Sequence, residues 1–205
     1  MTRTDNYQIQ VRQAQDRFLT YDQEALIRKM NLDADETYLY IAMLASPYRI
    51  HRKTGEFQRQ TADGWIDANS HGEVMTLLDL ICDSAEDRRV SGAWRSMAAF
   101  GLLFHRDMLE GKHDPWADRF EADPEGFRRA CLALKGRPLP MGDITYAIEL
   151  FDGLEVALQL WFGDEEFPAS LRLLWDANAL QYIKYETMWF ARGMLLQRLR
   201  EEMDR

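Results

Sequence analysis

The sequence predicts an α+β fold: a mainly antiparallel sheet packed with several helices, including a long C-terminal helix. Apolar and polar residues alternate from 144 to 160, as they do in paired strands. Apolar residues recur at helical spacing from 184 to 203. Strands and helices also occur in separate blocks, which is typical of α+β proteins. The 205 residues are 46% hydrophobic and contain no low-complexity linker, so a single domain over residues 1–205 is expected.

Capping residues mark the expected helix starts. A first helix is expected over residues 6–18, and Asp22 has the residue type of an N-cap for a short second helix. Ser70 opens a Ser-x-x-Glu capping box, in which the two side chains satisfy backbone N–H groups at the helix start. Asp114 and Asp123 each precede a proline, whose φ is already set for the first helical position.

The first strands are expected in the N-terminal third of the chain. Residues 36–44 are rich in β-formers and carry apolar side chains on both faces, which is typical of a central strand. Pro47 is expected to end this strand. A hairpin that turns at Gly55 is then expected to place Ile50 and Phe57 on one face.

The second hairpin can be predicted to its register. A two-residue turn at Asp152-Gly153 would place Leu150 opposite Glu155, so the apolar rows of the two strands would lie on opposite faces. A three-residue loop with glycine in its bulge position instead pairs Leu150 with Leu154. It also pairs Ile148 with Val156, so this register is predicted. Residues 171–175 are expected to add another strand.

Composition limits the classes of partner. The net charge is -9, which argues against nucleic acid, because nucleic-acid binders need a clustered positive field. Apolar runs are far shorter than the roughly 20 residues that cross a bilayer, so no membrane association is expected. The N-terminal residues lack a secretory pattern, and Cys82 and Cys131 are expected to pack as core thiols. A cytoplasmic protein is expected, and its charged stretch 83–90 is predicted to be a solvated loop.

The best candidate site is the acidic segment 161–168, which follows the hairpin over residues 144–162. Its aromatic and acidic side chains are the candidate ligand-binding residues: Trp161, Asp164, Glu165, Glu166 and Phe167. We expect a non-enzymatic accessory module that uses this segment to bind a small molecule or a protein partner.

A divalent-metal-assisted enzyme is the alternative, although no cofactor is evident from the sequence. Hard divalent cations prefer several oxygen ligands, and carboxylates near the expected strand ends provide them. The candidate metal ligands are Asp143, Asp164, Glu166 and Asp176, with Glu165 as a further ligand or general base. His105, Asp107 and His113 offer a mixed site of no specific spacing. Common phosphate-loop, hydrolase and zinc signatures are absent from the sequence.

The acidic segment also carries a family resemblance. Residues 161–168, followed by Leu-Leu-Trp-Asp at 173–176, resemble the signature of a prokaryotic family known as domain of unknown function 3786. Shorter matches are Asn6-Tyr7, Gly92-Ala93-Trp94, Leu134-Lys135-Gly136 and Gly142-Asp143-Ile144. The chain departs from the family pattern at 182–186, where relatives tend to have a proline. The resemblance implies no activity.

Overall fold

The protein has an α+β fold with two antiparallel five-stranded sheets, which confirms the predicted class. A computed structural model describes residues 3–101 and 114–205, with side chains from residue 6 onward. Backbone contacts divide the chain into two compact units. Unit 1 comprises Met1–Arg89 and Gln181–Met194, and unit 2 comprises Val90–Leu180 and Leu195–Arg205. The expectation of a single domain stays a prediction.

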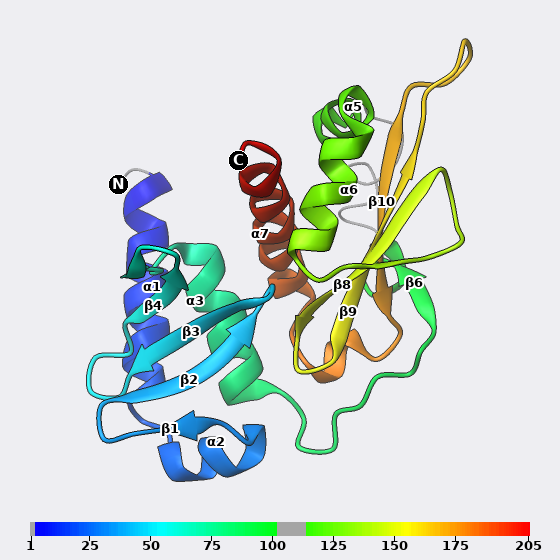
Figure 1. Cartoon of the computed structure of the whole chain (residues 1–205). Coiled ribbons are helices and arrows are strands. Elements are labelled where there is room, and N and C mark those ends of the chain that lie inside the picture. The colour runs from blue at the N-terminus through cyan, green and yellow to red at the C-terminus, as the bar shows by residue number, and fades with distance from the viewer. Residues whose placement is uncertain (1–2, 102–113) are drawn as a thin grey trace. The chain divides into compact units, whose positions relative to one another are not determined.

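Unit 1 contains the first sheet, in which the strands follow one another in sequence order (Figure 1). These strands are β1 (Asp33–Ala34), β2 (Tyr38–Met43), β3 (Ser46–His51), β4 (Phe57–Thr61) and β5 (Gly64–Asp67). Ile50 lies directly opposite Phe57, as predicted, and both side chains are fully buried. Leu39 pairs with Ile50 and extends this apolar face, so one face of the sheet forms the core of unit 1.

The helical segments of unit 1 are α1 (Arg3–Phe18), α2 (Gln23–Met30), α3 (His71–Leu78) and the π-helix η1 (Asp79–Asp83). Two of these helices, α2 and α3, begin where capping residues predict, whereas α1 begins three residues before its expected start. Asp22 and Ser70 accept hydrogen bonds from backbone N–H groups at the starts of α2 and α3. The Tyr48 hydroxyl donates to Glu73 Oε1 at 3.1 Å, which ties α3 to the buried face of the sheet.

The prediction that Pro47 ends a strand is wrong. Pro47 is the second residue of β3 and lies opposite Ala42 of β2. The chain instead reverses at Leu44 and Ala45, whose φ values are 49° and 57°. β4 pairs with β3 only from Tyr48 onward, so no residue of β4 lies opposite Pro47. The backbone N–H that proline lacks is therefore not required for a hydrogen bond to β4.

Unit 2 contains the second sheet, with the strand order β6-β10-β9-β8-β7. The strands are β6 (Trp94–Ser96), β7 (Arg137–Pro138), β8 (Ile144–Phe151), β9 (Leu154–Trp161) and β10 (Ser170–Asp176). The helices α5 (Pro115–Ala122) and α6 (Pro124–Ala133) begin at the predicted caps Asp114 and Asp123. The long helix α7 (Tyr185–Met203) is also confirmed, and its residues are shared between the two units. Short 3-10 turns lie at Met97–Ala99 and Ala179–Gln181.

The β8–β9 hairpin keeps its predicted faces but not its predicted turn. Ile148 pairs with Val156, as expected, whereas Leu154 pairs with Phe151 rather than with Leu150. The turn has two residues, Asp152 and Gly153, both at positive φ, and the ladder shifts by one residue between Glu149 and Phe151. This β-bulge absorbs the extra residue, so a two-residue turn no longer forces the apolar rows onto opposite faces.

Candidate functional site

The candidate site is the connection between β9 and β10, residues 161–168, which we call the tip. Every residue of the tip is exposed. Figure 1 shows the yellow-orange end of this hairpin extending beyond the rest of the second sheet. Trp161, the last residue of β9, pairs with Ser170, the first residue of β10. The tip is therefore a projection that is carried by a continuous β-ribbon.

Two carboxylates outside the tip hold its first turn. Asp143 Oδ2 accepts a hydrogen bond from the Phe162 N–H at 2.7 Å. Glu121 Oε1 accepts one from the Gly163 N–H at 2.6 Å. The backbone also approaches Gly163 closely, since a Cβ at this position would lie 2.9 Å from the Ala169 nitrogen. The base of the tip is thus fixed by α5, by the residue before β8 and by its own return strand.

Asp164 organises the far end of the tip. Its Oδ1 accepts hydrogen bonds from the N–H groups of Glu166 and Phe167, both at 2.8 Å. Its own N–H donates to the Phe167 carbonyl oxygen at 2.8 Å. The two backbone donors lower the pKa of the Asp164 carboxyl group. Asp164 is therefore committed to the turn, whereas Glu165 and Glu166 are exposed to solvent.

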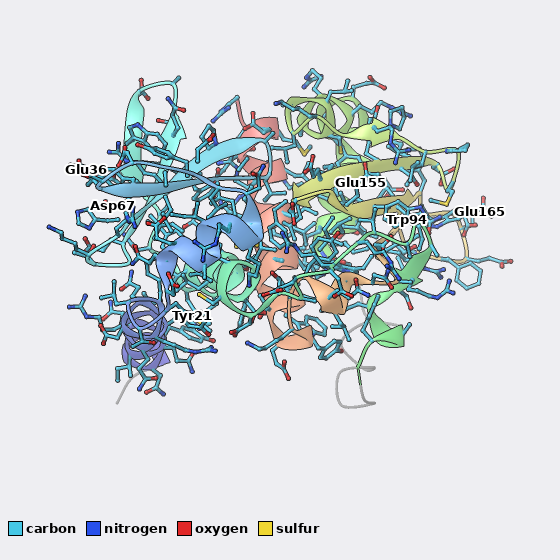
Figure 2. All side chains as sticks on the ribbon, turned by 90° about the horizontal axis from the view of Figure 1, so that it is seen from below. Tyr21, Glu36, Asp67, Trp94, Glu155 and Glu165 are labelled. Carbon is cyan, nitrogen blue, oxygen red and sulfur yellow. The ribbon has the colours of Figure 1, made fainter. Side chains whose placement is uncertain are left out.

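Three large aromatic side chains of the tip lie open to solvent. The exposed fractions are 42% for Trp161, 42% for Phe162 and 67% for Phe167. Glu165, from the same segment, lies at the outer margin of unit 2 (Figure 2). The five residues predicted to bind a ligand thus share one projection because they are adjacent in sequence. Phe162 lies in the same segment but was not among the predicted ligand-binding residues. The structure shows that its ring is exposed, so Phe162 belongs to the same candidate site.

The four candidate metal ligands do not come together. Asp143 and Asp164 lie at the tip or its base, but Asp176 is at the opposite end of β10, about 20 Å away at 3.3 Å per residue. Asp176 is buried and accepts hydrogen bonds from the N–H groups of Ser91, Gly92 and Asn178. Burial raises the pKa of the Asp176 carboxyl group, but these hydrogen bonds together lower it by more. The net shift of its pKa is therefore downward.

Within residues 3–101 and 114–205, no three His, Cys, Asp or Glu side chains are grouped so that they could hold a metal ion. His105, Asp107 and His113 lie outside the described residues.

A polar cluster in unit 1 escaped the sequence prediction. Asp83 was expected in a solvated loop, but it ends the π-helix η1 and its side chain is only 18% exposed. Its oxygens accept hydrogen bonds from Arg17, Tyr21 and Lys184. Lys184 also donates to Asp79 from both its ammonium group and its backbone N–H. These partners are far apart in sequence, so no local pattern signals the cluster.

Comparisons with known proteins give one family match. A family model described as "Domain of unknown function (DUF3786)" matches residues 22–198, which agrees with the resemblance carried by the sequence. No curated protein and no solved structure matches the chain. Among the described helices, none has the length and apolar character needed to cross a membrane.

Proposed function

We propose, from the premise that the chain belongs to the family of domains of unknown function DUF3786, that it is a non-enzymatic protein-binding module. The tip is its binding element. In this proposal, Trp161, Phe162 and Phe167 enter an apolar recess of the partner protein, while Glu165 and Glu166 face basic side chains around that recess.

The exposure of the three tip aromatics carries the proposal. Large apolar side chains that gather in solvent are uncommon on monomeric proteins, and such patches mark interaction sites. Tryptophan and other large aromatic anchors provide much of the binding energy at protein interfaces. The backbone bonds from Phe162 and Gly163 to Asp143 and Glu121 already order the tip, so binding costs less conformational entropy.

The shape of the tip favours a protein over a small molecule. Small ligands bind in concave sites that surround them, whereas the tip projects outward (Figure 1). Its carboxylates favour a basic partner surface, because opposite charges steer association and suppress incorrect partners. The same carboxylates disfavour anionic membranes and nucleic acids.

Photo-crosslinking tests this function. The photoreactive amino acid p-benzoylphenylalanine replaces Phe167 in the full-length chain, and the crosslinked protein is identified after irradiation in cells. The matched control places the same group at Leu132, another exposed apolar side chain of unit 2. We expect one discrete adduct from position 167 that is absent from position 132 and is lost when Glu165→Lys and Glu166→Lys are added. Equal labelling from both positions would contradict the proposal.

The metal-assisted enzyme remains the alternative function, and a thermal-shift measurement separates it from the binding module. A divalent ion at one hundred times its Kd would add about 2.7 kcal/mol to the free energy of unfolding. The binding module predicts equal melting temperatures with and without Mg²⁺, Mn²⁺ or Ca²⁺. An ion-specific rise that Asp164→Asn removes would favour the enzyme instead.

We place this interaction in the cytoplasm as part of the same proposal. Cys82 and Cys131 are free thiols, as is common in a reducing compartment. Burial raises the pKa of both, to about 12 for Cys82, so that neither is a reactive thiolate near neutral pH.

A further inference from the structure

Unit 1 contains a cavity of about 140 Å³ at one end of its sheet. Its walls include Tyr38, His51, Glu56, Gln58, Asp67 and Asn69. These residues meet because β2 begins at Tyr38, β3 ends at His51, and β5 ends at Asp67 in an antiparallel sheet. Figure 2 shows Asp67 at this end of unit 1. The volume is that of about four to five water molecules, which suits a small polar group.

The walls combine an aromatic corner with negative charge. The rings of Tyr38 and His51 meet edge to face, with centroids 5.4 Å apart and planes at 87°. Glu56 and Asp67 add two exposed carboxylates. Asn69 is held in place, because its amide exchanges hydrogen bonds with the backbone N–H and carbonyl of Phe57. Aromatic rings and carboxylates together are the groups that bind organic cations.

Two neighbouring arginines of the sheet are already engaged. The Arg49 guanidinium lies 4.2 Å from the centroid of the Tyr38 ring and 4.4 Å from that of Trp65, and its Nε donates to Gln58. Arg52 is bound to Glu24 and to the backbone of Asp35. This face of the sheet therefore already stacks one guanidinium on aromatic rings. Glu56 and Asp67 belong to neither of these ion pairs.

We propose that this cavity is a binding site for an alkylguanidinium group. The planar cation packs at the Tyr38–His51 corner and donates hydrogen bonds to Glu56 and Asp67. Guanidinium suits such a site because its donors form a rigid fork that matches carboxylates, and because it stacks on aromatic rings. The group comes either from a free small molecule or from an arginine side chain of a peptide. The site lies in unit 1 and does not depend on the proposed function of the tip.

Titrations followed by ¹H–¹⁵N NMR test the site in the full-length chain. The probes are n-butylguanidinium and its neutral analogue n-butylurea, followed at the backbone amides of His51, Gln58 and Asn69. We expect saturable shifts of these amides with butylguanidinium and none with butylurea. The peptide acetyl-Gly-Arg-Gly-amide distinguishes the two sources: tighter binding than butylguanidinium indicates an arginine side chain, and weaker binding indicates a free cation.

Matched variants decide whether the cavity is responsible. Glu56→Gln and Asp67→Asn should each raise the Kd for butylguanidinium about twofold to fivefold, the range for exposed charge pairs. Asp63→Asn removes the same charge in the β4–β5 turn, outside the cavity, and should leave the Kd unchanged. Equal effects of Asp63→Asn and Asp67→Asn, or equal shifts with butylurea, would overturn the proposal.

Discussion

Asp83 accepts hydrogen bonds from three side chains that come from distant parts of the sequence of unit 1. Burial raises its pKa, but the hydrogen bonds from Lys184, Arg17 and Tyr21 lower it more in total, to about 2. An unfolded aspartate titrates near pH 4. The carboxylate form is therefore favoured by folding, and this stabilisation is present above about pH 4 and is lost as the pH falls toward 2.

A substitution at Asp83 tests this role. We expect Asp83→Asn to lower the free energy of unfolding by roughly 1–2 kcal/mol at pH 7, allowing for solvent screening. The difference from the wild type should shrink between pH 4 and pH 2, because the wild-type carboxylate is then protonated. Urea unfolding at several pH values measures it, with Asp87→Asn, an exposed carboxylate, as the control. A difference that does not depend on pH would contradict the electrostatic explanation.

Single residues differ in how far the sequence could predict them. The tip residues are consecutive in the sequence, so adjacency alone placed Trp161 with Asp164 and its neighbours in one candidate site. Asp176 was grouped with them only because it follows a predicted strand, but that strand carries it away from the tip. Asp83 was missed because its partners lie 62 to 101 residues away in sequence. Local patterns identify side chains, whereas their partners depend on tertiary contacts.

At the scale of elements, helix starts and the hairpin at Gly55 were predicted well, whereas two other turns were not. Ser70 and Asp123 reveal helix starts through capping interactions that involve only neighbouring residues. The bulge between Glu149 and Phe151 has no residue signature, so the hairpin faces were correct while the turn was wrong. The turn at Leu44 and Ala45 lacks the glycine or asparagine that usually allows positive φ.

This turn gives an element-scale prediction. Ala45 is exposed with a φ of 57°, a conformation that costs a residue with a Cβ roughly 1 kcal/mol. We expect Ala45→Gly to raise the free energy of unfolding by about 0.5–1 kcal/mol. Ala62→Gly, in the β4–β5 turn of the same sheet, is the matched control, because Ala62 has no positive φ and should gain nothing. Equal changes in the urea midpoints of the two variants would argue against strain at Ala45.

At the scale of the whole molecule, the fold class was predictable but the division of the strands between two sheets was not. Alternation identifies a strand but not its neighbour in the sheet. The two units are also interleaved in sequence, because unit 1 takes residues 181–194 from the C-terminal part of the chain. The sequence has no low-complexity linker where the chain passes from one unit to the other, and a single domain was expected for that reason.

The interleaving predicts how fragments fold. The fragment 1–89 lacks Lys184, the partner of Asp79 and Asp83, and should give a poorly dispersed NMR spectrum. Arg89 donates its N–H to the Gln181 side chain at 3.0 Å, so a short Gly-Ser linker can join residue 89 to residue 181. We expect this fusion, ending at residue 194, to give a dispersed spectrum. A well-dispersed spectrum from the fragment 1–89 alone would contradict the assignment of residues 181–194 to unit 1.

The binding role of the tip is tested most directly by the affinity of the crosslinked partner, purified and titrated by calorimetry. Truncating an aromatic anchor at the centre of an interface costs about 2 kcal/mol or more, which is about thirtyfold in Kd. We expect Phe167→Ala to weaken binding by at least this factor, while Leu132→Ala leaves the Kd unchanged. Equal affinities of Phe167→Ala and the wild-type chain would contradict the assignment of the tip as the binding element.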